Sequence, residues 1–305
     1  MDRDNKKPKK LNTTGDIKVV TDNRFIIAKG LSALSLKARK LLYATIAQSR
    51  IRDSDFYEYE TTPKELAALW EMAPDHIYLD ARVFCRELME QVIEVEDTKS
   101  HRWKLYHLME SASYDEDHVI RIKMHKEMVD LLLGLNKNFS QSPLWTFMRF
   151  KSSYSMALWH LFERELRFFS RQDSGGLKPG QVVEFDLSLE ELRTVTGTEK
   201  KLLKANDFKK RVLDIAIREI RENLLINVTY KPIKKGRATH AYRFFASYIT
   251  SVDPETLSLR TRMKGRRAEL KRFATLRALS REEALELAAI EDELGQMTVE
   301  DFEPV

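Results

Sequence analysis

The sequence has a single cysteine, Cys85, among its 305 residues. One thiol cannot form an intrachain disulfide or a thiolate cage for a metal ion, which excludes a disulfide-stapled scaffold and a cysteine zinc site. Cys85 lies within the apolar helical pattern ARVFCRELM. We therefore expect it to be a buried packing residue of a cytosolic protein.

Long apolar runs are also missing. The most apolar stretch, MVDLLLGL at 128–135, is too short to cross a bilayer. The first ten residues, MDRDNKKPKK, are charged and contain no apolar segment. We therefore expect neither export nor membrane insertion.

Residues that carry catalysis are few or wrongly spaced. Only ten glycines are present and no GxxxxGK[ST] string occurs, which excludes this phosphate-binding loop of NTPases. The seven histidines show no metal-ligand spacing, and no His-hydrophobe-His pair stands near a nucleophilic tyrosine, as a nickase needs. We predict no catalytic residue, no cofactor and no metal site, and expect a protein that is not an enzyme.

One short string matches an enzyme motif. His240-Ala241-Tyr242-Arg243 fits the His-x-x-Arg of tyrosine recombinases, but those enzymes need a nucleophilic tyrosine well downstream, and Tyr248 follows too closely. The alternation of Tyr242 and Arg243 predicts a β-strand instead. A recombinase would form a covalent adduct with DNA, and we expect none.

Charged residues, in contrast, make up 32% of the chain, with a net charge of +5 and a pI of about 9.0. This balance indicates a soluble protein with a mild preference for anionic partners. The length and the 43% hydrophobic content allow two ordinary domains, each with a core.

One pattern occurs twice along the chain. Apolar residues at i, i+4, i+7, i+8 and i+12 predict an amphipathic helix from Leu34 and again from Tyr154. The alternating runs FYEYE and VVEFDL then predict short strands, and Thr62-Pro63-Lys64-Glu65 and Ser188-Leu189-Glu190-Glu191 predict capping boxes. A third helix follows in each half, at 80–91 and 207–223, and then strand-like runs: VIEVED, WKLYHLMESASY and HVIRIKM in the first half, LLINVTY and ATHAYRFFASY in the second.

This order is typical of a winged helix, so we predict an α+β fold with two tandem winged-helix domains and a charged C-terminal tail. The predicted parts are a basic N-terminal tail (1–16), an N-terminal domain (17–140), a C-terminal domain (141–250) and a charge-segregated tail (251–305). The turn-rich stretch GLNKNFSQSPLW at 134–145 is expected to connect the domains, and SRQDSGGLKPGQ at 170–181 to form a loop.

The predicted third helix of the second half has two different faces. Its apolar side holds Phe208, Val212, Leu213, Ile215, Ala216 and Ile220. Its polar side holds Lys210, Arg211, Asp214, Arg218 and Arg221. One interpretation is a solvated face on which Asp214 pairs with Lys210 and Arg218.

The hairpin that follows favours DNA binding. No carboxylate occurs from Asn223 to Phe245, and basic residues gather at the predicted turn, namely Lys231, Lys234, Lys235 and Arg237. A basic helix beside a cationic wing fits duplex DNA, because a helix enters the major groove while wing cations meet phosphates.

Roles can be divided along this surface. The base-reading candidates are Lys210, Arg211, Asp214 and Asn206, although the sequence favours a helix cap over base reading for Asn206. The phosphate-binding candidates are Lys200, Lys201, Lys204, Arg218, Arg221, Lys231, Lys234, Lys235 and Arg237.

The first half is more acidic, and its candidates for DNA contact are Arg82, Arg86, His101 and Arg102. Protein pairing through its strands is the other role considered.

The runs DFKKRVLDIAIREIRENLLINVTYKPIKKGR, RFKSSYSMALWHLFERE and VEFDLSLEELRTVTG resemble the replication initiator (Rep) proteins of iteron-containing plasmids, over about 18–245. The resemblance implies that the C-terminal domain is the main reader of repeated origin sequences, while the N-terminal domain adds DNA contacts and a dimer surface. It also implies a bacterial cytoplasmic protein in a monomer–dimer equilibrium. Monomers would open the origin and recruit the host initiator and helicase, and dimers would repress their own gene. A winged-helix transcriptional repressor without a replication role is the alternative.

The tail separates its charges. Nine Lys and Arg stand against one Glu from Arg260 to Arg281, whereas nine Asp and Glu and no base follow from Glu282 to Val305. The run from Ser280 predicts a capped amphipathic helix, with a disordered polyampholyte as the alternative. We hypothesise that the acidic end folds over the protein's own cationic surface and lowers its DNA affinity. Deletion of 282–305 should then raise affinity at low salt, and an unchanged affinity would contradict the hypothesis.

Overall fold

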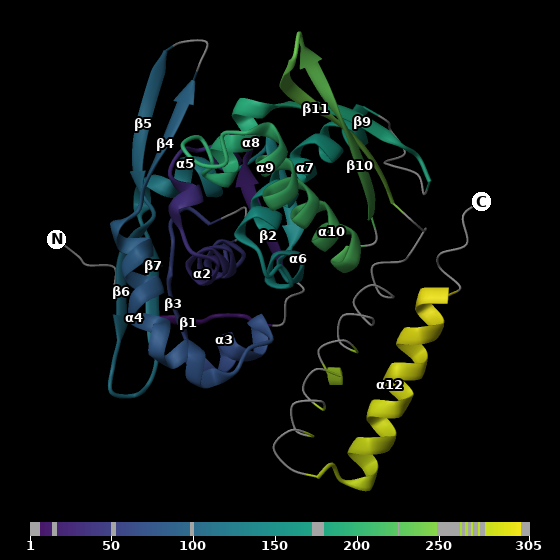
Figure 1. Cartoon of the computed structure of the whole chain (residues 1–305). Helices are drawn as coiled ribbons and strands as arrows, with labels where there is room; N and C mark the ends of the chain where they lie inside the picture. The colour runs from purple at the N-terminus through teal and green to yellow at the C-terminus, as the bar shows by residue number, and fades with distance from the viewer. Residues whose placement is uncertain are drawn as a thin grey trace, which may run out of the picture.

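The computed structural model describes residues 7–13, 17–49, 53–97, 101–172, 180–224, 226–248, 263, 266, 267, 270, 274 and 278–299. Within these residues, helices and strands follow the predicted winged-helix order twice (Figure 1). The α+β fold of two winged helices is therefore confirmed. Most of the predicted loop at 170–181 lies outside the described residues.

The first winged helix occupies the N-terminal half. It consists of α2 (Leu36–Ile46), β3 (Glu58–Thr61), α3 (Pro63–Trp70), α4 (Pro74–Glu90), β4 (Val92–Asp97) and β5 (Arg102–His107). The predicted capping box opens α3, since Thr62 Oγ1 accepts from Glu65 N and the Glu65 carboxylate accepts from Thr62 N. The third helix, α4, begins at Pro74 rather than at the predicted Asp80, because proline suits a first helical turn.

Additional elements surround this unit. They are β1 (Lys9–Lys10), β2 (Lys18–Asp22), α1 (Asn23–Ile26), η1 (Leu31–Ala33), β6 (Met109–Tyr114), β7 (Ile120–Met124), η2 (Lys126–Met128), α5 (Val129–Leu132), β8 (Phe139–Pro143) and α6 (Leu144–Met148). The single strand-like run predicted at 103–114 divides at Leu108, since β5 pairs with β4 whereas β6 pairs with β7. As a result, β3 joins the four-stranded sheet β1-β3-β7-β6 instead of the wing hairpin.

The second winged helix is the more regular copy. It consists of α7 (Ser153–Gln172), β9 (Val183–Ser188), α8 (Leu189–Thr196), α9 (Ala205–Phe208), the π-helical turn η3 (Lys209–Leu213), α10 (Asp214–Asn223), β10 (Ile226–Lys235) and β11 (Ala238–Tyr248). Here β9 pairs with β11, so the wing is a three-stranded sheet of order β10-β11-β9. Ser188 caps α8 by accepting from Glu191 N at 3.0 Å, whereas the Glu191 carboxylate lies 2.8 Å from Arg164.

The predicted connection at 134–145 is partly wrong. Residues 139–143 form β8, which pairs antiparallel with β2, so the predicted boundary at 140/141 falls inside a strand. The polar composition is misleading because two buried serines find partners: Ser140 Oγ donates to Asn23 Oδ1, and Ser142 Oγ accepts from Trp159 Nε1 at 3.3 Å. The buried apolar residues of both halves accordingly form one continuous core.

A buried histidine joins the halves within this core. The ring of His160, on α7, lies 2.9 Å from Thr21 Oγ1 of β2 through Nε2 and 2.9 Å from Tyr43 Oη of α2 through Nδ1. Burial disfavours the imidazolium, and Arg39 and Arg164 add to this effect, which together lower the pKa of His160 to about 3. The neutral ring is therefore part of the folded state.

Acidification should destabilise the protein through His160. The unfolded histidine binds a proton below pH 6.5, but the folded one does not until about pH 3. The contribution of the neutral ring to the free energy of unfolding is therefore complete above pH 6.5 and is lost as pH falls toward 3. At pH 5 the loss is about 2 kcal/mol. Urea unfolding of wild type and His160→Gln at pH 7 and 5 tests this. Burial raises the pKa of Glu163 to about 8, but Glu163 titrates in both proteins. Equal pH dependence in the two proteins would refute the assignment to His160.

The tail contains the predicted helix, α12 (Arg281–Val299). Its capping box is confirmed, since Ser280 N donates to the Glu283 carboxylate and Glu283 N donates to Ser280 Oγ. The helix packs Leu287 and Ile290 against Met263 and Leu270, and its Glu286 pairs with Arg266 at 2.8 Å. These contacts join the acidic helix to the basic segment of the tail itself. None of the described helices is long and apolar enough to cross a membrane.

Candidate nucleic-acid interface

The predicted reading helix of the second half is α9, η3 and α10 taken together. The sequence predicts an uninterrupted α-helix at 207–223, but the helix begins at Ala205 and contains a π turn at 209–213. The backbone N–H of Asp214 bonds the carbonyl of Lys209, five residues earlier. Such turns put one extra residue into a helix and are frequent at functional sites.

The faces of this helix largely follow the prediction. Its buried residues are Phe208, Val212, Leu213, Ala216, Ile217 and Ile220. Ile217 replaces the predicted Ile215, which is only half-buried. The exposed residues include Lys210, Arg211, Arg218 and Arg221, so the cations of the predicted stripe face solvent together.

The ion pairs of Asp214 differ from those expected for a solvated face. It pairs with Lys209, at 2.9 and 3.0 Å, and accepts from Tyr230 Oη. The partner is five residues away rather than four because the π turn stacks residues 209 and 214. Arg218 lies 4.0 Å from Glu222 instead of beside Asp214. The two ion pairs expected for a solvated face, from Asp214 to Lys210 and from Asp214 to Arg218, are therefore wrong.

The turn before the reading helix is organised by Arg193, a residue outside the predicted DNA-binding set. Its guanidinium donates to four backbone carbonyls, those of Thr198 (2.8 Å), Lys201 (3.0 Å), Leu202 (3.0 Å) and Leu203 (3.1 Å). It also lies over the ring of Phe208, 4.9 Å from the centroid. An arginine just before a helix C-terminus is the only sequence signal for this role, and it is a weak one.

The predicted phosphate candidates on this turn are exposed. Lys200, Lys201 and Lys204 all reach solvent next to the start of the helix. Asn206 is exposed as well, but the residue at the N-cap is Lys204. The helix cap that the sequence favours for Asn206 is therefore wrong, and the side chain of Asn206 is exposed in the first turn.

The wing carries its cations as predicted. Gly236, at φ 63°, belongs to the turn that joins β10 to β11, a left-handed conformation that glycine adopts without strain. The exposed basic residues around it are Lys231, Lys234, Lys235 and Arg237. Lys231 Nζ lies 5.4 Å from the centroid of the Phe245 ring. In Figure 1 the hairpin extends past the helices toward the top of the view.

The recombinase-like string lies in this wing. Tyr242 is 3% exposed, whereas Arg243 points outward and pairs with Asp186 of the neighbouring strand at 2.8 Å. The two residues therefore occupy opposite faces of β11, as their alternation predicts. Among the described residues, no group of three or more His, Cys, Asp or Glu is arranged to hold a metal ion.

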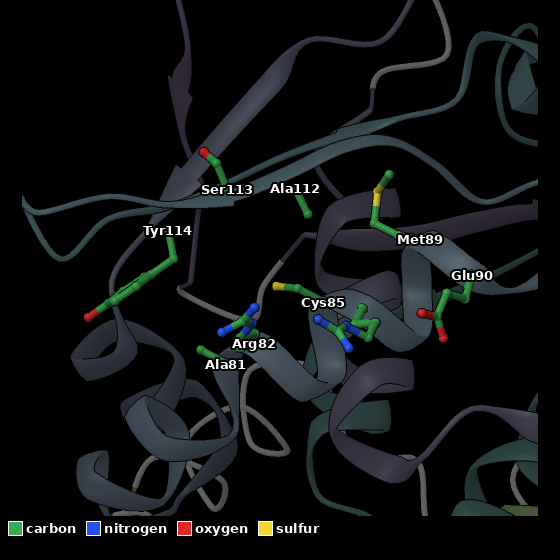
Figure 2. Close-up of a pocket in the computed structure, with 9 residues that line it drawn as sticks. Ala81, Arg82, Cys85, Met89, Glu90, Ala112, Ser113 and Tyr114 are labelled. Atoms are coloured by element: carbon green, nitrogen blue, oxygen red, sulfur yellow. The ribbon is translucent and has the colours of Figure 1, made fainter.

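The first half presents its candidates in a different setting. Arg82 and Arg86 are exposed on α4 and line a groove of about 540 Å³ between α4 and β6 (Figure 2). Cys85 is half-buried, because it packs against the core and also lines this groove, and burial raises the pKa of its thiol to about 12. His101 and Arg102 are exposed where the β4–β5 hairpin turns.

The charges of the two wings differ. On the first wing, Lys104 pairs with Glu127 and Asp130 at 3.0 and 3.2 Å. Nearby Lys29 pairs with both Glu94 and Glu96. Lys104 of the β4–β5 hairpin is therefore held by two carboxylates, whereas the tip of β10–β11 has no carboxylate in its sequence. The second wing therefore has its exposed cations in a carboxylate-free segment, whereas carboxylates lie beside a cation of the first wing.

Two family models and a solved structure match the chain. Residues 18–163 match the family model described as Initiator Replication protein, WH1, and residues 188–245 match Initiator Rep protein, WH2. No curated protein matches the chain. Among solved structures, the chain is similar to one described as the Pi initiator protein in complex with iteron DNA, with a TM-score of 0.62 and 20% identity, over 77% of this chain and 98% of that one.

The bounds of the two family models can be placed on the helices and strands of the structure. The first ends within α7, and the second runs from Ser188, the cap of α8, to Phe245 in β11. It therefore covers the reading helix and its wing. Together the models span about two thirds of the sequence. The chain belongs to the plasmid replication initiator (Rep) protein family, which its sequence resembles.

Proposed function

We propose that the protein binds duplex DNA at the direct repeats (iterons) of a plasmid origin and initiates replication without catalysing a reaction. The observation that carries the proposal is the second winged helix, where an exposed basic helix face lies next to a cationic hairpin. Binding energy and DNA deformation would supply the work. Repeats bound side by side would bend the origin and strain neighbouring A·T-rich steps, which yield first.

The base-reading role is proposed for Lys210, Arg211 and Asn206, which are all exposed in the first turns of the reading helix. Arginine can bond guanine through two donors, and asparagine can do the same with adenine. The phosphate-binding role is proposed for the cations of the turn, the end of the helix and the wing, namely Lys200, Lys201, Lys204, Arg218, Arg221, Lys231, Lys234, Lys235 and Arg237.

The first winged helix is proposed to add weaker DNA contacts through Arg82, Arg86, His101 and Arg102, and to provide a dimer surface. The monomer would open the origin and recruit the host initiator and helicase. As dimers it would bind an inverted repeat and repress its own gene. A cytoplasmic, bacterial location and the absence of any cofactor follow from this proposal.

A footprint on DNA from the replicon that encodes the chain, measured at two salt concentrations, tests the function. Protection should cover tandem direct repeats. As salt rises, binding to the repeats should persist after binding to random DNA is lost, since base contacts resist salt better than phosphate contacts do. Protection of an inverted repeat alone would instead favour the second candidate, a transcriptional repressor without a replication role.

Lys234→Ala tests the wing. Lys234 is exposed on β10 beside the turn, and removing one phosphate contact should weaken binding to all sequences similarly. The slope of log affinity against log salt should become shallower by about one unit. Lys137→Ala, which removes an exposed lysine outside the proposed interface, is the control for general charge effects and should leave the slope unchanged. An unchanged slope in Lys234→Ala would remove the wing from the interface.

A further inference from the structure

Three side chains connect the π turn of the reading helix with the wing. Lys209 Nζ lies 2.9 and 3.0 Å from the carboxylate oxygens of Asp214, and Tyr230 Oη, from β10, donates to the same carboxylate. Lys209 Nζ is also 5.6 Å from the centroid of the Tyr230 ring. Each of the three residues therefore contacts the other two.

The ion pair fits only the π turn. Asp214 N–H bonds the carbonyl of Lys209, so backbone and side chains join the same two residues. In a regular α-helix the residue one turn before Asp214 would be Lys210. The Lys209–Asp214 pair therefore favours the π register over the α register, and Lys210 stays exposed and outside the pair.

Tyr230 is held firmly enough to act as a fixed point. Its ring packs edge-on against Tyr242, with centroids 5.6 Å apart, and in a tilted arrangement against Phe244, with centroids 5.8 Å apart. Burial and the bond to Asp214 raise the pKa of Tyr230, which keeps the hydroxyl a donor. Partial burial opposes ionisation of Asp214, but the bonds from Tyr230 and Lys209 outweigh it, and the pKa of Asp214 lies below its ordinary value.

We infer that Lys209, Asp214 and Tyr230 form a latch that fixes the register in which Lys210 and Arg211 meet the DNA. The latch touches the helix inside the turn that carries both readers, and it anchors that turn to the wing strand. Asp214, predicted as a base reader, has a positioning role instead. This inference rests on the proposed function, because the latch matters for DNA only if the helix reads it.

Tyr230→Phe tests the latch. The change removes the hydroxyl that bonds Asp214 and keeps the ring that packs on Tyr242 and Phe244. The probes are duplex DNA from the origin of the encoding replicon and random duplex DNA of equal length. We expect the ratio of the two affinities to fall by about tenfold, with affinity for random DNA and the salt slope unchanged, because no phosphate contact is lost.

Two further variants separate positioning from general stability. Tyr242→Phe removes a hydroxyl from the same aromatic cluster and should leave the affinity ratio unchanged. Asp214→Asn weakens the pair with Lys209, and combined with Tyr230→Phe it should lower the ratio by less than the product of the two single effects, since both changes open one latch. Independent, multiplying effects would show that no latch exists.

The outcomes distinguish this inference from the proposed function. If the wild-type chain does not prefer origin DNA, the proposed function fails. If the wild type discriminates and Tyr230→Phe discriminates equally well, the function stands and the latch is refuted. A loss that is equal on origin and random DNA would also refute it, because it would indicate a weakened domain rather than a shifted reading register.

Discussion

Arg211→Ala is expected to lower affinity for the preferred origin sequence by about 1 to 3 kcal/mol, roughly five- to 150-fold, and to relax the preference at one base pair. Arg211 lies in the π turn with its side chain exposed. A guanidinium at that position can reach O6 and N7 of guanine through two donors, which no alanine can replace. Binding titrations on origin DNA and on single-base variants of it measure both effects.

Arg218→Ala is the matched control for this change. It removes the same guanidinium from α10, at a site proposed to hold phosphate, where the side chain is also exposed. We expect it to weaken origin and random DNA alike and to make the salt dependence shallower. If Arg211→Ala behaves in the same way, Arg211 binds phosphate and is not a reader.

The order of the elements was predictable because each has a local signal. The capping boxes at Thr62 and Ser280 form as their sequences require, and the alternation of the strands gives β9, β10 and β11. The periodicity of apolar residues likewise identifies the buried side of the reading helix. Such signals depend on residues a few positions apart, so they can be read from a single sequence.

Features that depend on distant residues were not predictable. The serines and proline of β8 are typical of turns and predict a loop, and the strand is explained only by its contacts with β2 and Trp159, far away in sequence. The π turn has no local signature either. Its stabilising partner, Tyr230, belongs to another element, so a helical wheel misplaces Ile217 and the partner of Asp214.

The candidate site was predictable in its charge but not in its support. The lysines and arginines of the helix and the hairpin can be read directly from the sequence, and the structure exposes them on the helix face and the wing. Arg193 and Tyr230, which are proposed to position them, make their contacts only after the chain has folded. Arg193 therefore provides a direct test of how much the reading surface depends on its support.

Arg193→Ala is expected to reduce the free energy of unfolding by about 2 to 4 kcal/mol, because carbonyls that accept from a charged donor lose it together. The estimate is below the sum of four such bonds, since Lys201 and Leu203 are exposed and water can replace the donor there. Leu202, at φ 50°, holds a left-handed conformation that an L-residue avoids, and its carbonyl loses a partner as well. Urea unfolding measures the effect.

The same change should remove most sequence preference under conditions where the variant is still folded. The four carbonyls belong to the turn that sets the start of the reading helix, and the guanidinium lies over Phe208, which anchors that helix in the core. Without it, the exposed lysines of the turn remain and random DNA should bind almost as well as before. Arg221→Ala, an exposed arginine on α10, is the control and should leave unfolding unchanged. A variant that unfolds more easily yet reads origin DNA as selectively as wild type would show that Arg193 stabilises the domain without positioning the readers.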